Sequence, residues 1–151
     1  MGGVLQMGWA MKVGDVMARD IEFIDGAASL QEAAEMMGEL DVGALPVGSA
    51  DQLEGVVTDR DILYRYVAKG LAPGAVTVRD VMTSPVVSCD EDDALRAAMD
   101  SMAANHFRRM PVRNARGAVV GWITLADLSR KLLIDSRALQ NFMQELTEVQ
   151  P

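Results

Sequence analysis

The sequence predicts an α/β (α+β) fold built from two copies of one β-α-β-β-α unit, and three matched stretches support this. VGDVM at residues 13–17 matches VRDVM at 78–82, a spacing of 65 residues. LPV at 45–47 matches MPV at 110–112 at the same spacing. GVVTDRDI at 55–62 matches GWITLADL at 121–128 at a spacing of 66, because the turn of the second copy is one residue longer. Such a repeat, with one residue inserted in a turn, indicates two structural units.

Each copy predicts the same elements in the same order. Apolar runs at 21–24 and 86–89 indicate a first strand. Apolar residues at helical spacing follow, and they are Leu30, Ala33, Ala34, Met37 and Leu40 in the first copy and Leu95, Ala98, Met99 and Met102 in the second. Two strands joined by a polar turn come next, at 42–47 and 53–57 and then at 109–112 and 118–123. A second helix begins near Asp59 and near Leu125.

The repeat also predicts the boundaries along the chain. We expect an N-terminal arm over residues 1–10, a first copy over 11–68, a linker over 69–77, a second copy over 78–135 and a C-terminal helical extension over 136–151. Gly and Pro in the linker are typical of a turn. One copy of about 60 residues buries too little surface to be secure alone, so we expect the copies to pack about a pseudo-two-fold axis. Leu30, Met37, Leu95 and Met102 should be buried.

Composition argues against several classes of partner. The formal net charge is −8, with 22 acidic and 14 basic residues, which disfavours nucleic acid. No apolar run approaches the 18 to 20 or so residues of a membrane helix, and the N-terminus lacks the basic start of a signal peptide. We therefore expect a cytoplasmic protein with no membrane partner. The single cysteine, Cys89, excludes an internal disulfide, and its apolar surroundings suggest a small buried hydrophobe rather than a reactive thiol.

Two polar features have both a structural and a chemical interpretation. The acidic run DEDD at 90–93 favours a helix start near Asp90 or Glu91, although the same carboxylates could hold a divalent cation. We expect no metal site. His106 is interpreted as a structural hydrogen-bonding residue, because no nucleophile or metal set accompanies it.

The Thr-x-x-Asp pattern is the main candidate for function. Thr58 and Thr124 each close an apolar strand, and Asp61 and Asp127 follow three residues later in the first helical turn. One interpretation is a helix cap, with Thr as the N-cap residue and Asp as its reciprocal acid. The other is a nucleotide site, because a helix N-terminus binds phosphate and an adjacent carboxylate can accept hydrogen bonds from a ribose diol. The two interpretations are compatible, and the residues alone leave both open.

The ordered set of D-V-M, Pro-Val and Thr-x-x-Asp, present twice at one period, resembles a tandem pair of CBS domains, the cystathionine-β-synthase-type repeat. The resemblance covers about residues 10 to 135, and the ordered set is far more specific than a single G-x-x-T-x-x-D. It implies two β-α-β-β-α units that form a module with two clefts between them. Such clefts commonly hold adenosine compounds, here AMP, ADP or ATP, with S-adenosylmethionine or NADH as further possibilities.

The resemblance also implies roles for individual residues. Asp61 and Asp127 would hold ribose hydroxyls, and Thr58 and Thr124 would hold phosphate oxygens. Side chains around Ile21 and from Thr83 to Val86 would line the adenine.

The basic residues make the two clefts unequal. Arg108 and Arg109 stand just before Met110-Pro111, where nucleotide-binding members offer a phosphate contact, but Gly43 and Ala44 occupy the matching positions. Arg60 has no counterpart in the second copy. Each arginine could instead be a solvated charge.

We therefore expect a regulatory module, not an enzyme, that binds an adenosine nucleotide and signals to an unidentified effector protein. Small residues on the helices and apolar residues between 125 and 149 predict a homodimer. The alternative is an oligomerisation or protein-interaction module whose pockets bind nothing.

Overall fold

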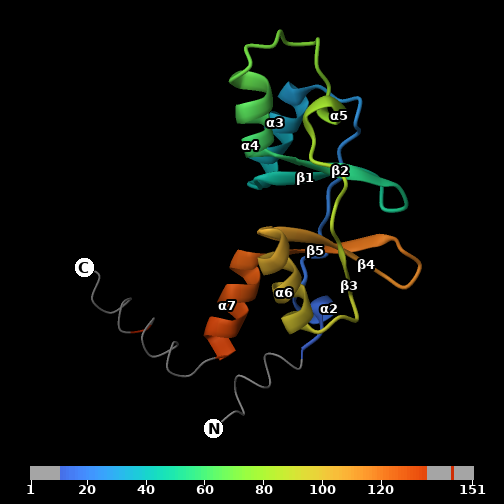
Figure 1. Cartoon of the computed structure of the whole chain (residues 1–151), viewed down its shortest axis with the longest axis vertical. Coiled ribbons are helices and arrows are strands. Elements are labelled where there is room, and N and C mark those ends of the chain that lie inside the picture. Colours follow the sequence, from blue (N-terminus) through green and yellow to red (C-terminus); the bar gives the residue numbers. More distant parts are fainter. Residues whose placement is uncertain (1–10, 136–143, 145–151) are drawn as a thin grey trace. The chain divides into compact units, whose positions relative to one another are not determined.

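The computed structural model describes residues 11–135 and residue 144, and the chain divides into two compact units (Figure 1). Unit 1 combines the described residues of the ranges 1–19, 88–114 and 121–151, and unit 2 combines Asp20–Val87 with Ala115–Val120. Each unit is therefore built mainly from one repeat but also contains the D-V-M segment that begins the other repeat, residues 13–17 in unit 1 and 78–82 in unit 2. The predicted arm at 1–10 and nearly all of the predicted extension at 136–151 lie outside the described residues. The two-fold relation between the copies stays a prediction.

Unit 2 is built on a β-hairpin with helices beside it. Its elements are α3 (Leu30–Leu40), β1 (Ala44–Gly48), β2 (Leu53–Thr58), α4 (Asp59–Ile62), the π-helical turn η1 (Leu63–Val67) and α5 (Val78–Val81). β1 and β2 pair antiparallel, and Ile24 adds a single parallel bridge to Val47. The core of the unit joins α3, the hairpin and α5 through apolar side chains that include Leu30, Leu45 and Val78.

Unit 1 has a similar arrangement and is built mainly from the second copy. Its elements are α2 (Val13–Val16), β3 (Cys89–Asp90), α6 (Leu95–Asn105), β4 (Arg109–Arg113), β5 (Val119–Thr124, of which residues 121–124 belong to this unit) and α7 (Leu125–Asp135). The strands form a sheet of order β3-β4-β5 in which β3 runs parallel to β4. Figure 1 shows α6 and α7 beside this sheet.

The two long matched helices confirm the predicted stripes except at Ala34 and Leu40, which are exposed. Leu30, Met37, Leu95 and Met102 are all buried. α3 begins with a capping box, in which Ser29 Oγ accepts from the Glu32 N–H at 3.1 Å and Glu32 Oε2 accepts from the Ser29 N–H at 3.2 Å. Cys89 is also buried, as predicted, and burial raises the pKa of its thiol to about 12, with smaller contributions from two nearby aspartates. Its thiol is therefore protonated at neutral pH and unreactive.

The acidic run at 90–93 forms a turn, so the predicted helix start at Asp90 or Glu91 is wrong. The Asp90 N–H donates to Asp93 Oδ2 at 2.9 Å, and the Asp93 N–H donates back to the Asp90 carbonyl at 3.0 Å. The turn uses the Asp93 carboxylate before the helix begins, and α6 starts at Leu95 after Ala94.

The first strand of each copy is shorter than predicted. Residues 21–23 form no strand, only Ile24 makes a bridge, and β3 contains two residues instead of four. The reason is that the chain passes from one unit to the other between Arg19 and Asp20 and again between Val87 and Ser88. A segment that connects two units has little neighbouring strand to pair with.

The D-V-M segments form short helices that the sequence did not predict. In α2, Asp15 Oδ2 accepts from the Lys12 N–H at 3.1 Å, and in α5, Asp80 Oδ2 accepts from the Thr77 N–H at 2.8 Å. The hydrogen bonds from Thr77 lower the pKa of Asp80. The repeated aspartate of D-V-M is therefore a capping residue. Within the described residues, no helix is both long and apolar enough to cross a membrane.

Candidate functional site

Each unit joins its second hairpin strand to the D-V-M segment of the other repeat. In unit 2, Val56 and Thr83 exchange two backbone hydrogen bonds, of 3.0 and 2.8 Å. In unit 1, Trp122 and Ala18 exchange the corresponding pair, both of 2.9 Å. Thr83 and Ala18 therefore occupy matching positions, each next to the strand that leads into a Thr-x-x-Asp helix.

The glycine that opens each motif permits this close approach. A Cβ on Gly55 would lie 2.6 Å from the sulfur of Met82, and a Cβ on Gly121 would collide with the sulfur of Met17. Both methionines belong to the D-V-M segments. The glycine at the start of G-x-x-T-x-x-D is thus needed because, in each unit, this strand lies directly against the D-V-M segment of the other repeat.

A second repeated hydrogen bond places the start of the helix against the residue before the hairpin. The Asp59 N–H donates to the Gly43 carbonyl at 2.9 Å, and the Leu125 N–H donates to the Arg108 carbonyl at 2.6 Å. In unit 1 this brings the backbone of Arg108, and Arg109 after it, beside the N-terminus of α7. Gly43 and Ala44 offer no charge at the matching place in unit 2.

In unit 2 the Thr-x-x-Asp pattern forms a closed capping box. The Asp61 N–H donates to Thr58 Oγ1, and the Thr58 N–H donates to Asp61 Oδ2, both at 3.0 Å. The hydroxyl of Thr83 lies 3.3 Å from each oxygen of the same carboxylate, and Arg65 Nε lies 3.7 Å from Oδ1. Only 10% of the Asp61 side chain is exposed. The capping interpretation is confirmed for this copy.

Arg65 is a residue of this network that the sequence analysis missed. One of its terminal nitrogens donates to the carbonyls of Val81 and Met82, both at 3.1 Å. It thereby ties η1 to the end of α5. The available signal was its position four residues after Asp61, which places two opposite charges on one helical face.

In unit 1 the corresponding carboxylate is more open. The Asp127 N–H donates to Thr124 Oγ1 at 3.0 Å, so Thr124 caps α7 as Thr58 caps α4. The side chain of Asp127 is 40% exposed, and Arg130, which pairs with it at 3.7 Å, is itself exposed. Ala18 stands where unit 2 has Thr83, and alanine has no hydroxyl to donate.

The other predicted site residues differ in their surroundings and in their exposure. The guanidinium of Arg60 stacks over the ring of Tyr64 at 5.5 Å, on the exposed side of α4. Arg108 is exposed and Arg109 is half-buried. Ile21 and Val86 are half-buried in the connections between the units. A nucleotide contact at these positions stays a prediction.

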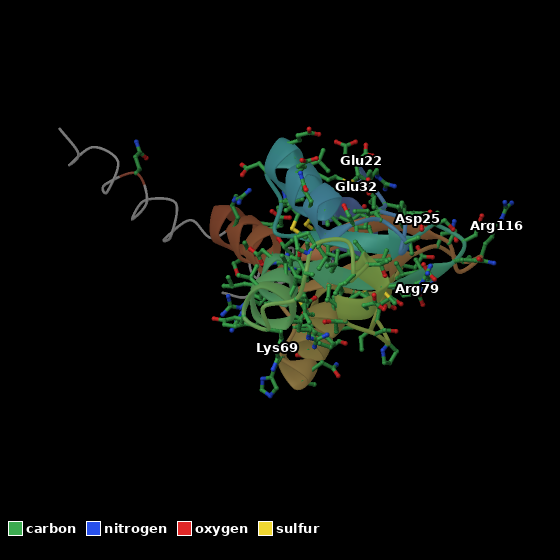
Figure 2. All side chains as sticks on the ribbon, turned by 90° about the horizontal axis from the view of Figure 1, so that it is seen from above. Glu22, Asp25, Glu32, Lys69, Arg79 and Arg116 are labelled. Atoms are coloured by element: carbon green, nitrogen blue, oxygen red, sulfur yellow. The ribbon has the colours of Figure 1, made fainter. Side chains whose placement is uncertain are left out.

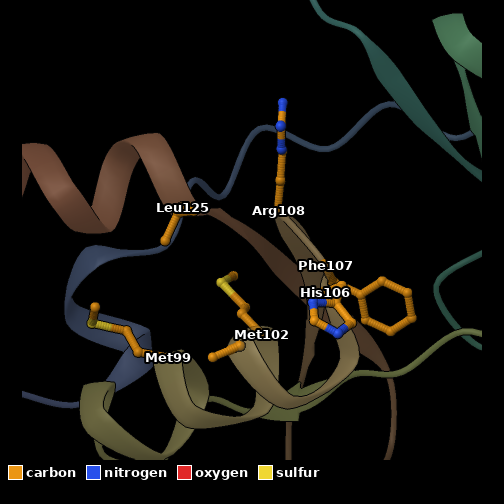
Figure 3. Close-up of a pocket in the computed structure, with 7 residues that line it drawn as sticks. Met99, Met102, His106, Phe107, Arg108 and Leu125 are labelled. Atoms are coloured by element: carbon orange, nitrogen blue, oxygen red, sulfur yellow. The ribbon is translucent and has the colours of Figure 1, made fainter.

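Unit 1 also holds a pocket of about 410 Å³ that the sequence analysis did not predict (Figure 3). Its lining is Met99, Met102, Ala103, His106, Phe107, Arg108 and Leu125. The side chain of Arg108 extends away from the space between the two methionines and Leu125, so the walls are mainly apolar. Ala34 and Asp59 replace Met99 and Leu125 at the matching positions of the first copy. Across the described residues, no group of three or more His, Cys, Asp or Glu side chains could hold a metal ion.

The network around Asp61 predicts a stability effect. Replacing Thr83 by Val keeps the side chain's size but removes the hydroxyl that donates to a buried carboxylate. We expect the free energy of unfolding to fall by about 1 to 3 kcal/mol, measured by urea titration. Thr83→Ser, which keeps the hydroxyl, should lose less than half as much. An unchanged free energy of unfolding in Thr83→Val would contradict this prediction, because the hydroxyl would then contribute nothing.

Comparison with known proteins identifies the repeat. The model of the CBS domain matches residues 13–68 and 78–134. Hypoxic response protein 1 of Mycobacterium tuberculosis is 33% identical over 119 residues, which cover 78% of this chain and 82% of that protein.

Solved structures with the same fold contain several kinds of ligand. A crystal structure of Hypoxic Response Protein I with two coordinated zinc ions has a TM-score of 0.69, 31% identity, and coverage of 80% of this chain and 98% of that one. CBSX2 in complex with AMP has a TM-score of 0.68, 27% identity, and coverage of 83% and 98%. The CBS domain pair of MJ0100, in complex with 5-methylthioadenosine and S-adenosyl-L-methionine, has a TM-score of 0.70, 25% identity, and coverage of 80% and 94%. With two matches that span most of its length, the chain belongs to the CBS domain family and is a tandem pair of these domains.

Proposed function

We propose that the protein is a regulatory module that binds an adenosine nucleotide, AMP, ADP or ATP, at the N-terminus of α7 in unit 1. The observation that carries the proposal is the exposed carboxylate of Asp127 beside a capped helix start, next to which a backbone hydrogen bond holds Arg108. Similar domain pairs have been solved with AMP and with S-adenosylmethionine, which share an adenosine group.

Asp127 would bind the ribose. A carboxylate is an acceptor only, and its two oxygens can take the two hydroxyl donors of a ribose diol. Its 40% exposure leaves room for such a ligand. This contact is common to every ribose-bearing ligand, so it would select adenosine compounds as a class and not one member of the class.

The phosphate would be bound by charge and by the helix. Arg108 and Arg109 supply guanidinium donors, which pair well with phosphate oxygens. The Leu125 N–H already donates to the Arg108 carbonyl and the Asp127 N–H to Thr124 Oγ1, so the Thr124 hydroxyl adds the donor here, and the helix dipole favours negative charge. These groups would favour phosphate-bearing ligands over S-adenosylmethionine, which carries a positive sulfonium, and NADH would need room for a second nucleoside.

Exposed apolar side chains on unit 2 support a homodimer. Leu63, Tyr64 and Val67 on η1 are each more than half exposed, and Leu40 and Val42 lie exposed at the end of α3 and just after it. Monomers rarely leave several large apolar side chains together on one surface. The predicted interface residue Leu128 is instead buried in unit 1, and Leu139, Phe142, Met143 and Leu146 lie outside the described residues. An effector protein that reads the bound state would use surface that this dimer leaves free.

The binding proposal predicts that two variants change the affinities for AMP and adenosine in different ways. Asp127→Asn removes the charged acceptor and should weaken AMP and adenosine alike, by about 1.5 to 3 kcal/mol or roughly ten- to a hundredfold. Arg109→Ala should weaken AMP far more than adenosine, because it removes a phosphate partner only. Isothermal titration calorimetry measures both effects.

Arg79→Ala is the matched control for the arginine variant. Arg79, labelled in Figure 2, is paired with Glu54 at 3.0 Å in unit 2, so its removal changes the net charge equally and replaces no residue of unit 1. AMP affinity should stay unchanged in this variant. Failure of AMP, ADP and ATP to bind the wild type at millimolar concentration would contradict the proposal and favour the interaction-module alternative.

The dimer proposal predicts a change of mass. Val67→Glu places a charge among exposed apolar side chains, and it should shift the wild-type dimer to a monomer in light scattering at micromolar protein concentration. Lys69→Glu, an exposed charge change two residues away, should leave the dimer intact. A monomer mass for the wild type would overturn the homodimer.

A further inference from the structure

We propose that the residue after the D-V-M segment, Thr83 or Ala18, decides which of the two Thr-x-x-Asp sites accepts a nucleotide, so that the chain binds one nucleotide, in unit 1. The Thr83 hydroxyl occupies the carboxylate of Asp61, whereas Ala18 leaves the carboxylate of Asp127 open. This inference rests on the proposed function and specifies its site and stoichiometry.

The two positions are equivalent in backbone structure. Thr83 and Ala18 each exchange two hydrogen bonds, of 2.8 to 3.0 Å, with the strand residue two places before the capping threonine. The two aspartates each follow their threonine by three residues, and each aspartate N–H donates to the threonine hydroxyl at 3.0 Å. The side chain at the position of Thr83 or Ala18 is therefore one chemical difference between these matched carboxylates, and the paired cation, Arg65 for Asp61 and Arg130 for Asp127, is another.

The acceptors of Asp61 are already in use. The Thr83 hydroxyl is within 3.3 Å of both carboxylate oxygens, and the Thr58 N–H is 3.0 Å from one of them. Arg65 adds a cation at 3.7 Å. A ribose diol needs both oxygens, so it would have to displace the threonine hydroxyl from a side chain that is only 10% exposed. Displacement without a replacement partner costs the hydroxyl its hydrogen bond.

The arginines of unit 1 also favour nucleotide binding there, and their effect is separate from that of the hydroxyl. Arg108 and Arg109 stand beside α7, while Gly43 and Ala44 stand beside α4. A simple preference for unit 1 could follow from the arginines alone. The test must therefore change the hydroxyl in unit 1 while both arginines stay in place.

Ala18→Thr adds the missing hydroxyl beside Asp127, and Ala18→Val adds the same volume without it. Ala18 is exposed, so both side chains can be accommodated. Calorimetry on the full chain measures affinity and stoichiometry for AMP and for 2′-deoxy-AMP, whose ratio reports the contact of the carboxylate with the diol.

For the wild type we expect one AMP per chain and a ratio of affinities for AMP over 2′-deoxy-AMP of about ten or more. Ala18→Thr should reduce that ratio to near one and weaken AMP about tenfold, while 2′-deoxy-AMP changes little. Ala18→Val should keep the wild-type ratio and AMP affinity within about twofold. Thermal unfolding of both variants establishes that each is folded.

Three results would overturn the inference. Equal effects of Ala18→Thr and Ala18→Val would show that volume, and not the hydroxyl, matters. Two equivalent AMP sites per chain would show that Thr83 does not close unit 2. In both cases the proposed function stands. Absence of AMP binding to the wild type would overturn the proposed function together with this inference.

Discussion

The structure depends on one repeated backbone contact, the pair of hydrogen bonds that joins the second hairpin strand of each unit to the D-V-M segment of the other repeat. These bonds link Val56 with Thr83 and Trp122 with Ala18 at 2.8 to 3.0 Å. Because each bond pair crosses between repeats, neither unit can be assembled from one repeat alone. The opening glycines follow from the same contact, since a Cβ on Gly55 or Gly121 would meet a methionine of the D-V-M segment.

That contact also determines what the repeated carboxylates can do. It sets the residue after the D-V-M segment, Thr83 or Ala18, beside each Thr-x-x-Asp helix, and the identity of this residue then changes the chemistry. A threonine turns Asp61 into the centre of a buried network that includes Arg65, whereas an alanine leaves Asp127 exposed. The two copies therefore share their backbone contacts, and their side chains differ in whether the repeated carboxylate is buried or exposed. Buried carboxylates with several donors add stability, but a ligand has to enter a buried site and displace a donor to bind them.

The parts predictable from the sequence are those that depend on near neighbours along the chain. The stripe from Leu30 to Met37 and the threonine caps of α4 and α7 involve residues three or four apart, so spacing alone indicates them. The pairing of each D-V-M segment with a strand of the other repeat was not predictable in this way. Val56 and Thr83 are far apart in sequence, and both lie in apolar stretches with many possible partners. The prediction of longer first strands was wrong for a related reason. Residues 21–24 have strand-like composition, but their pairing depends on where the chain passes between units.

The candidate site shows the same division. The unequal arginines were visible from the matched sequences, and the hydrogen bond from Leu125 to the Arg108 carbonyl shows how the fold brings that difference to a helix start. The role of Thr83 was not visible, because its contact with Asp61 arises only through the exchanged segment. The apolar pocket was missed as well, since Met99 and Leu125 come from different elements and gain meaning only when α6 and α7 pack together.

A crystal structure of the protein grown with AMP tests the central claim most directly. The account predicts one nucleotide per chain in unit 1, with its ribose hydroxyls within hydrogen-bonding distance of Asp127 and with the bond between Thr83 and Asp61 intact. A nucleotide whose ribose is held by Asp61, with the Thr83 hydroxyl displaced, would contradict it.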